Sequence, residues 1–145
     1  MASQLRAVSF LLLAVLVLST IGCGDGRPDR FPVSGRVTID GAPLTYGHVR
    51  FVPDNARPSG GQLDAQGRFT LTCYDGGDGA VPGLHKIEIA AGELRGSNMH
   101  WHAPKKYNTI ATSGKTVTID GPVDDLEIKL TWDGGQPFDE EMEQE

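Results

Sequence analysis

The chain has 145 residues, with 19 acidic and 13 basic side chains and a formal net charge of −6 at pH 7. This length suits one domain with a single hydrophobic core. The acidic balance and the lack of a basic run interleaved with aromatic residues argue against a nucleic-acid partner.

An apolar run lies near the start of the chain, from Phe10 to Cys23 (FLLLAVLVLSTIGC), after one basic residue, Arg6. The run is shorter than the about 20 apolar residues that span a membrane, so it predicts an export signal peptide over residues 1–22. Its end, the tetrapeptide TIGC, resembles the lipobox of bacterial lipoproteins, although its threonine stands where leucine is usual. The resemblance implies that the chain is cut before Cys23 and that Cys23 carries lipid.

The predicted lipidation determines where the protein is expected. Several acyl chains make a lasting anchor, because each buried CH₂ contributes about 0.8 kcal/mol. We therefore expect a lipoprotein of the cell envelope, outside the cytoplasm. Gly24 follows the cysteine, and resemblance to sorted lipoproteins then favours the periplasmic face of the outer membrane. The alternative is an ordinary secretory signal with an incidental cysteine. Residues 23–32 are expected to form a short polar linker.

Residues 33–132 show repeated period-two alternation of apolar and polar side chains and no useful helical periodicity. This alternation predicts strands, each with one buried face. Seven are expected, around Val33–Ile39, His48–Val52, Gln62–Leu63, Arg68–Cys73, Leu84–Ile89, Val117–Ile119 and Leu126–Trp132. Seven short strands in about 100 residues are typical of an all-β, seven-stranded antiparallel β-sandwich.

The same alternation predicts the core. Fourteen large side chains are expected to point inward, with Leu130 and Trp132 extending the set: Val33, Val37, Ile39, Val49, Phe51, Leu63, Phe69, Leu71, Ile87, Ile89, Val117, Ile119, Leu126 and Ile128. Cys73 is expected to be a small buried hydrophobic residue, since a lipidated Cys23 leaves no second cysteine for a disulfide. His85 takes an inward position and His48 an outward one.

Three segments carry a family resemblance: VSGRVTIDGAPLTYGHVRFVP (Val33 to Pro53), LDAQGRFTL (Leu63 to Leu71) and DGAVPGLHKIEI (Asp78 to Ile89). They resemble the carboxypeptidase regulatory-like modules, which are transthyretin-like (prealbumin-like) sandwiches. PKKYNTIATSG (Pro104 to Gly114) is similar to a segment of small bacterial lipoproteins that carry this module after a lipobox. The resemblance implies an Ig-like Greek-key sandwich that acts as a binding or structural module, with no enzymatic activity and no cofactor.

His100 and His102 are the sharpest candidates for chemistry, because residues at i and i+2 on an extended strand share one side and can ligate one metal ion. Some dioxygenases built on a prealbumin-like sandwich bind ferric iron through a His-x-His pair and two tyrosines. This chain offers Tyr46, Tyr74 and Tyr107, but the Arg-Pro that precedes the pair in those enzymes is missing. A small metal-dependent, intradiol-dioxygenase-like enzyme is therefore the alternative to a binding module.

Two segments between strands are the surfaces where we expect binding. Residues 92–107 are expected to form a polar and aromatic loop over a sheet edge, where Trp101 either caps the sandwich or recognises a ligand. The loop from Tyr74 to Val81 holds Asp75 and Asp78 among glycines. Their spacing fits no EF-hand, so the glycines indicate a crossover between strands rather than a calcium site.

The remaining features describe partners and the end of the chain. Ser113 lacks the sequence context of a serine nucleophile. The expected partners are the membrane, through the lipid anchor, and an envelope protein or polysaccharide; a purely structural envelope protein is a further alternative. Residues 133–145 contain six acidic residues and no basic one, a composition that predicts a disordered tail.

Overall fold

The computed structural model describes residues 26–142, so the predicted signal peptide and Cys23 lie outside the described residues. Across residues 26–142 the structure contains eleven strands, one short 3₁₀ helix and no α-helix. The elements are β1 (Val33–Ile39), β2 (Ala42–Pro43), β3 (His48–Pro53), β4 (Ser59–Gln62), β5 (Arg68–Thr70), β6 (Gly83–Ala90), β7 (Gly92–Arg95), β8 (Asn98–Trp101), η2 (Lys105–Asn108), β9 (Lys115–Ile119), β10 (Val123–Leu130) and β11 (Phe138–Glu141). The all-β prediction is confirmed, and the expected number of strands is too low.

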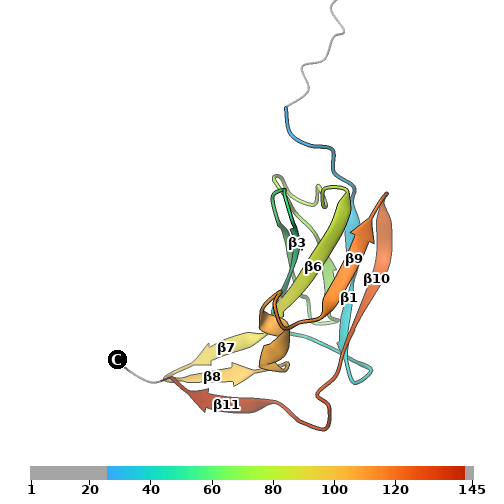
Figure 1. Cartoon of the computed structure of the whole chain (residues 1–145). Helices are drawn as coiled ribbons and strands as arrows, with labels where there is room; N and C mark the ends of the chain where they lie inside the picture. Colours follow the sequence, from blue (N-terminus) through green and yellow to red (C-terminus); the bar gives the residue numbers. More distant parts are fainter. Residues whose placement is uncertain (1–25, 143–145) are drawn as a thin grey trace, which may run out of the picture.

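Two four-stranded sheets form the main body, which we call the sandwich (Figure 1). One sheet has the order β10-β1-β2, with β5 also paired to β1, and the other has the order β4-β3-β6-β9. The pairing of β1 with β10 is parallel, which corrects the expectation of an antiparallel fold throughout. These are the first and last strands of the sandwich, so the whole intervening chain serves as the long connection that a parallel pair requires.

The core lies between the two sheets and matches the alternation pattern closely. Of the fourteen predicted inward residues, all but Ile39, Val117 and Leu126 are buried, and these three are partly buried and pack against the same cluster. The rings of Phe51 and Phe69 approach across the sandwich, with centroids 6.0 Å apart. Burying a large apolar side chain contributes roughly 1.5–3 kcal/mol, so this cluster supplies most of the stability.

Individual predictions for the core have mixed outcomes. Cys73 and His85 are buried, as expected, and the Nε2 atom of His85 lies 2.8 Å from the carbonyl oxygen of Val81. Leu130 is buried, whereas Trp132 is only partly covered and its ring contacts Phe138 edge-on at 6.4 Å. Trp132 therefore packs beside the sandwich rather than extending its core.

A third sheet, with the order β11-β8-β7, projects from one end of the sandwich, and we call it the arm (Figure 1). The chain enters the sandwich at the opposite end. The arm replaces the expected loop over residues 92–107. Strands β7 and β8 form a hairpin whose turn contains Gly96 at a φ of +64°, a left-handed conformation that glycine adopts without strain.

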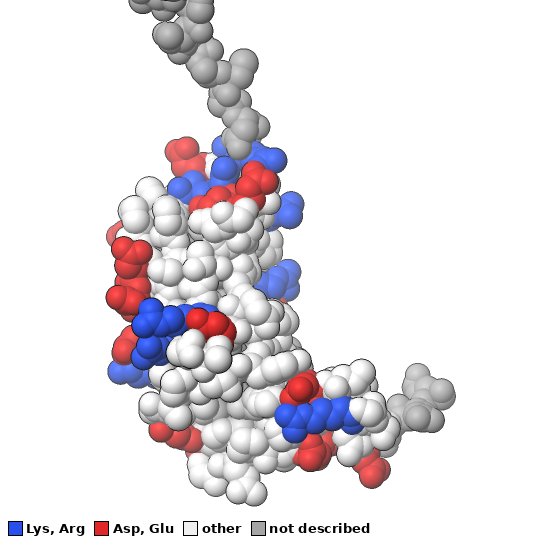
Figure 2. All heavy atoms as spheres, turned by 180° about the vertical axis from the view of Figure 1, so that it is seen from behind, with Lys and Arg blue, Asp and Glu red and all other residues white. Residues whose placement is uncertain are grey.

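The predicted disordered tail is also corrected, for the part up to residue 142. Strand β11 pairs with the free edge of β8, with Asp139 opposite His100. Two acids of this segment meet basic partners from η2: Lys105 lies 2.8 Å from Glu140, and Lys106 forms an ion pair with Asp133. Composition alone predicts a solvated tail, but partners brought in by the fold give these acids a fixed place. Figure 2 likewise shows acidic and basic side chains side by side on the arm.

Candidate binding surface on the arm

The register of the arm sorts its side chains onto two faces. Leu94 lies opposite Met99, and Met99 opposite Glu140. Glu93 lies opposite His100 in the same way. Because side chains alternate along a strand, residues one position apart point to opposite faces. One face is therefore mainly apolar and the other polar.

The apolar face is largely open to solvent. Leu94 has 64% of its surface exposed, Met142 49% and Phe138 39%, so three of the six exposed large hydrophobic residues in the described part of the chain are on or beside the arm. Exposed aliphatic and aromatic side chains that cluster mark interaction sites more often than scattered ones do. This face is the strongest candidate for contact with a partner.

Trp101 lies on this face but is buried, so its ring is not available to bind a ligand. It is 9% exposed. Its indole N–H donates a hydrogen bond to Glu140 at 3.0 Å, and the ammonium of Lys105 lies 5.6 Å from its ring centroid. Trp101 thus joins β8, β11 and η2. These contacts lie within the arm and with η2, so they show neither of the two roles expected for it.

The polar face holds the two predicted histidines, each with its own carboxylate. Nδ1 of His100 lies 2.7 Å from Asp139, and Nε2 of His102 lies 2.8 Å from Glu93. The two rings are 4.6 Å apart and edge to face, and the Tyr46 ring stacks on His102 at 4.7 Å. Across residues 26–142, no group of three or more His, Cys, Asp and Glu residues is arranged to hold a metal ion.

The other two tyrosines lie away from this pair. Tyr107 is buried, and its hydroxyl accepts a hydrogen bond from the amide of Thr131 at 3.2 Å. The Tyr74 ring has three guanidinium groups within 5.0 Å of its centroid, those of Arg27, Arg30 and Arg57. The described structure therefore brings Tyr46 alone among the three tyrosines to the histidines.

The carboxylates that hold the arm together are ionised at neutral pH. The hydrogen bond from His102, followed by that from Arg95, holds the pKa of Glu93 below its usual value. The hydrogen bonds from Lys105 and Trp101 lower the pKa of Glu140 in the same way. Three carboxylates of the arm were not among the predicted site residues: Glu93, Asp139 and Glu140. The alternation of side chains in residues 92–101, on both sides of Gly96, could have predicted the hairpin of β7 and β8. No feature of the sequence near β11 indicates that this strand pairs with β8.

The glycine-rich loop has a structural role. Asp78 accepts hydrogen bonds from the amides of Cys73 at 2.7 Å and Asp75 at 3.2 Å, and the Arg30 guanidinium lies 2.9 Å away. Burial raises the pKa of Asp78, but these amides and the arginine outweigh burial and lower it overall. Phe31 forms a β-bridge with Ala80. The end of the expected linker is thus fixed to the sandwich by this loop.

Comparison of the chain with protein-family models, with curated proteins and with solved structures gives no match. The resemblance to carboxypeptidase regulatory-like modules therefore stays a prediction from the motifs. In the described range, no helix has the length and apolar character needed to cross a membrane.

Proposed function

We propose that this protein is a lipid-anchored lipoprotein of the cell envelope, held by Cys23 at the periplasmic face of the outer membrane. It acts as a non-enzymatic binding module, and its arm contacts an envelope protein. Its sandwich is a carboxypeptidase regulatory-like, transthyretin-like module. The observation that carries the binding role is the solvent-exposed apolar face of the arm, where Leu94 is 64% exposed.

The two edges of the arm add to this argument. In the described structure, β7 and β11 each have one strand neighbour, β8. Each edge strand therefore leaves backbone N–H and C=O groups for another strand, which is how many proteins take up an extended segment of a partner. The apolar side chains supply the burial that such pairing needs.

The placement of the arm suits a tethered binder. The chain enters the sandwich at one end, and the arm projects from the other (Figure 1). A lipid on Cys23 would hold the entry end near the membrane. The arm then faces away from the anchor, where a partner has access.

The anchor is tested by Cys23→Ser. We expect this variant to leave the membrane fraction or to keep its signal peptide, because the thiol is the atom that carries the lipid. The measurement is membrane fractionation together with labelling by a radioactive fatty acid. Labelling equal to that of the unchanged protein contradicts the anchor.

The binding role is tested by a Leu94→Ser, Phe138→Ser double variant in capture from detergent-solubilised envelopes. Leu84→Ser is the matched control, since Leu84 is a 54% exposed apolar residue on β6 of the sandwich. We expect the double variant to lose the captured protein and the control to keep it. Equal capture by both variants contradicts the arm as the contact surface.

Metal analysis of the purified protein tests the alternative, a metal-dependent enzyme. Stoichiometric iron, zinc or copper that is lost in a His100→Ala, His102→Ala variant would favour the enzyme.

A further inference from the structure

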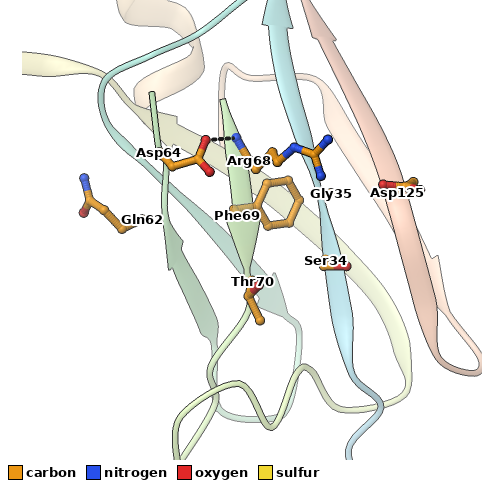
Figure 3. A pocket seen from close by; sticks show the side chains of 8 residues that line it. All are labelled: Ser34, Gly35, Gln62, Asp64, Arg68, Phe69, Thr70 and Asp125. Carbon is orange, nitrogen blue, oxygen red and sulfur yellow. Dashed lines mark hydrogen bonds between the residues drawn. The ribbon is translucent and has the colours of Figure 1, made fainter. Parts of the chain in front are cut away.

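A second surface, on the sandwich itself, has the features of a ligand site. A hollow of about 560 Å³ opens on the sheet that contains β1, β5 and β10 (Figure 3). Its polar lining includes Ser34, Gln62, Asp64, Arg68, Thr70 and Asp125. A second hollow of about 470 Å³ on the same sheet is lined by residues that include Arg36, Thr38, Glu127 and Lys129.

Each hollow is lined by one arginine, Arg68 in the first and Arg36 in the second. The pairing of β1 with β5 places Arg36 directly opposite Arg68. Neither guanidinium makes a hydrogen bond or an ion pair with another residue among residues 26–142. Both arginines nevertheless lower the pKa of the nearby Asp64, and the register of β1 with β10 places Glu127 opposite Arg36. Like charges directly opposite each other on neighbouring strands destabilise a sheet. A planar guanidinium binds carboxylates with two parallel hydrogen bonds, so this pair is suited to an added oxyanion.

Hydrogen-bond acceptors and hydroxyls surround the arginines. Oδ1 of Asp64 accepts the amides of Gln66 and Arg68, each at 2.8 Å, and Oδ2 has no hydrogen-bond partner within the described part. The hydrogen bond from the backbone amide of Arg68 is the main cause that lowers the pKa of Asp64, so this carboxyl group is ionised at neutral pH. Ser34 lies opposite Thr70 in the register, which adds two hydroxyl groups.

An irregularity in the pairing of β1 with β10 places another acidic residue, Asp125, in the lining of the first hollow. The register of β1 and β10 shifts between Val33 and Gly35, and Asp125 in this bulge adopts a left-handed φ of +56°. Bulges re-aim side chains and are enriched beside functional sites. In Figure 3 the Arg68 side chain reaches across β1 toward the side where Asp125 lies. The bulge thus adds a carboxylate on the far side of the arginine.

The lining offers no exposed aromatic ring. Phe69 is 4% exposed. Its ring fills the space over Gly35, where a Cβ would lie 2.9 Å from the Phe69 ring. Recognition here depends on charges and hydroxyls rather than on stacking. A ligand that fits carries a carboxylate for the arginines and several hydroxyls for Asp64, Asp125, Ser34 and Thr70.

We propose that this surface binds an acidic glycan through its uronate sugars, with the carboxylate held between Arg36 and Arg68. Two hollows on one sheet match a polymer better than a single small anion. The net charge of −6 repels polyanions in general, so binding requires this local arrangement. The site is separate from the arm and goes beyond the proposed function, so a failure here leaves the role of the arm unaffected.

The test titrates the full chain, in a non-ionic detergent at low salt, with an oligogalacturonate, its methyl ester and a dextran sulfate, by calorimetry. The variants are Arg36→Gln, Arg68→Gln and their combination. The matched control is Arg50→Gln, because Arg50 lies on the other sheet and already pairs with Glu88 at 3.0 Å. We expect the oligogalacturonate to bind, and the double variant and the methyl ester each to weaken binding by about tenfold or more. We expect Arg50→Gln to change little.

Several outcomes overturn this proposal. The first is no binding of the oligogalacturonate by the unchanged protein. The second is equal weakening by the double variant and by Arg50→Gln, which indicates diffuse attraction. Equal binding of the methyl ester removes the role of the carboxylate, and equal or tighter binding of dextran sulfate removes the preference for uronates. Circular dichroism of each variant confirms that a loss of binding is not a loss of fold.

Discussion

The sandwich and the arm are built from the same element, the short strand, yet they are stabilised differently. The sandwich encloses a continuous apolar cluster in which Phe51, Val37 and Leu71 are fully buried. None of the described arm side chains belongs to that cluster, and the arm is tied by exposed pairs such as Lys105 with Glu140. Exposed ion pairs contribute about 0–1 kcal/mol each. The sandwich therefore sets global stability, and the arm can open locally before the sandwich unfolds.

The largest effect is expected from a cavity in the sandwich. Phe51→Ala removes a fully buried ring that contacts Phe69 and His85. We expect a loss of about 3–5 kcal/mol in the free energy of unfolding, since such truncations lose burial and leave a cavity. Chemical denaturation followed by circular dichroism measures it. A change below about 1 kcal/mol would mean that this cluster does not control stability.

A smaller and local effect is expected when β11 is removed by ending the chain after Trp132. The variant loses the ladder between β11 and β8 and the bond from Trp101 to Glu140. We expect faster hydrogen exchange in β7 and β8 and little change in β3 and β6. Hydrogen exchange with mass spectrometry separates the two regions. A fully disordered tail predicts no change in β8, and a cooperative single unit predicts faster exchange everywhere.

The smallest effect is expected from pH. The lowered pKa values of Glu93 and Glu140 mean that the unfolded chain takes up protons before the folded arm does as pH falls. Their contribution to arm stability is therefore full above pH 4.5, the ordinary glutamate value, and is lost as pH falls through the lowered pKa values. The Trp101 indole proton resonance reports this opening. Glu140→Gln should weaken its response, while Glu88→Gln on the sandwich should not.

Local pattern was sufficient for most of the sandwich strands and most of the core, but not for the strands of the arm. Period-two alternation places Val33, Val37 and Phe51 inside because the two sides of a strand are separated by a single residue, a property of the neighbouring sequence alone. The buried positions of Cys73 and His85 follow from the same pattern. The candidate surfaces did not: His100 and His102 were found, but the carboxylates beside them were not.

The sequence by itself therefore determined that the chain is all-β, which side chains point inward, and the motif on which the predicted anchor at Cys23 rests. Only the tertiary structure decided that β1 runs parallel to β10, that β11 joins β8, and that Arg36 lies opposite Arg68. The physical reason is the distance along the sequence between the residues that interact. Strand formation depends on adjacent residues, whereas the partner of a strand edge is chosen by segments far along the chain, as Asp139 and His100 show.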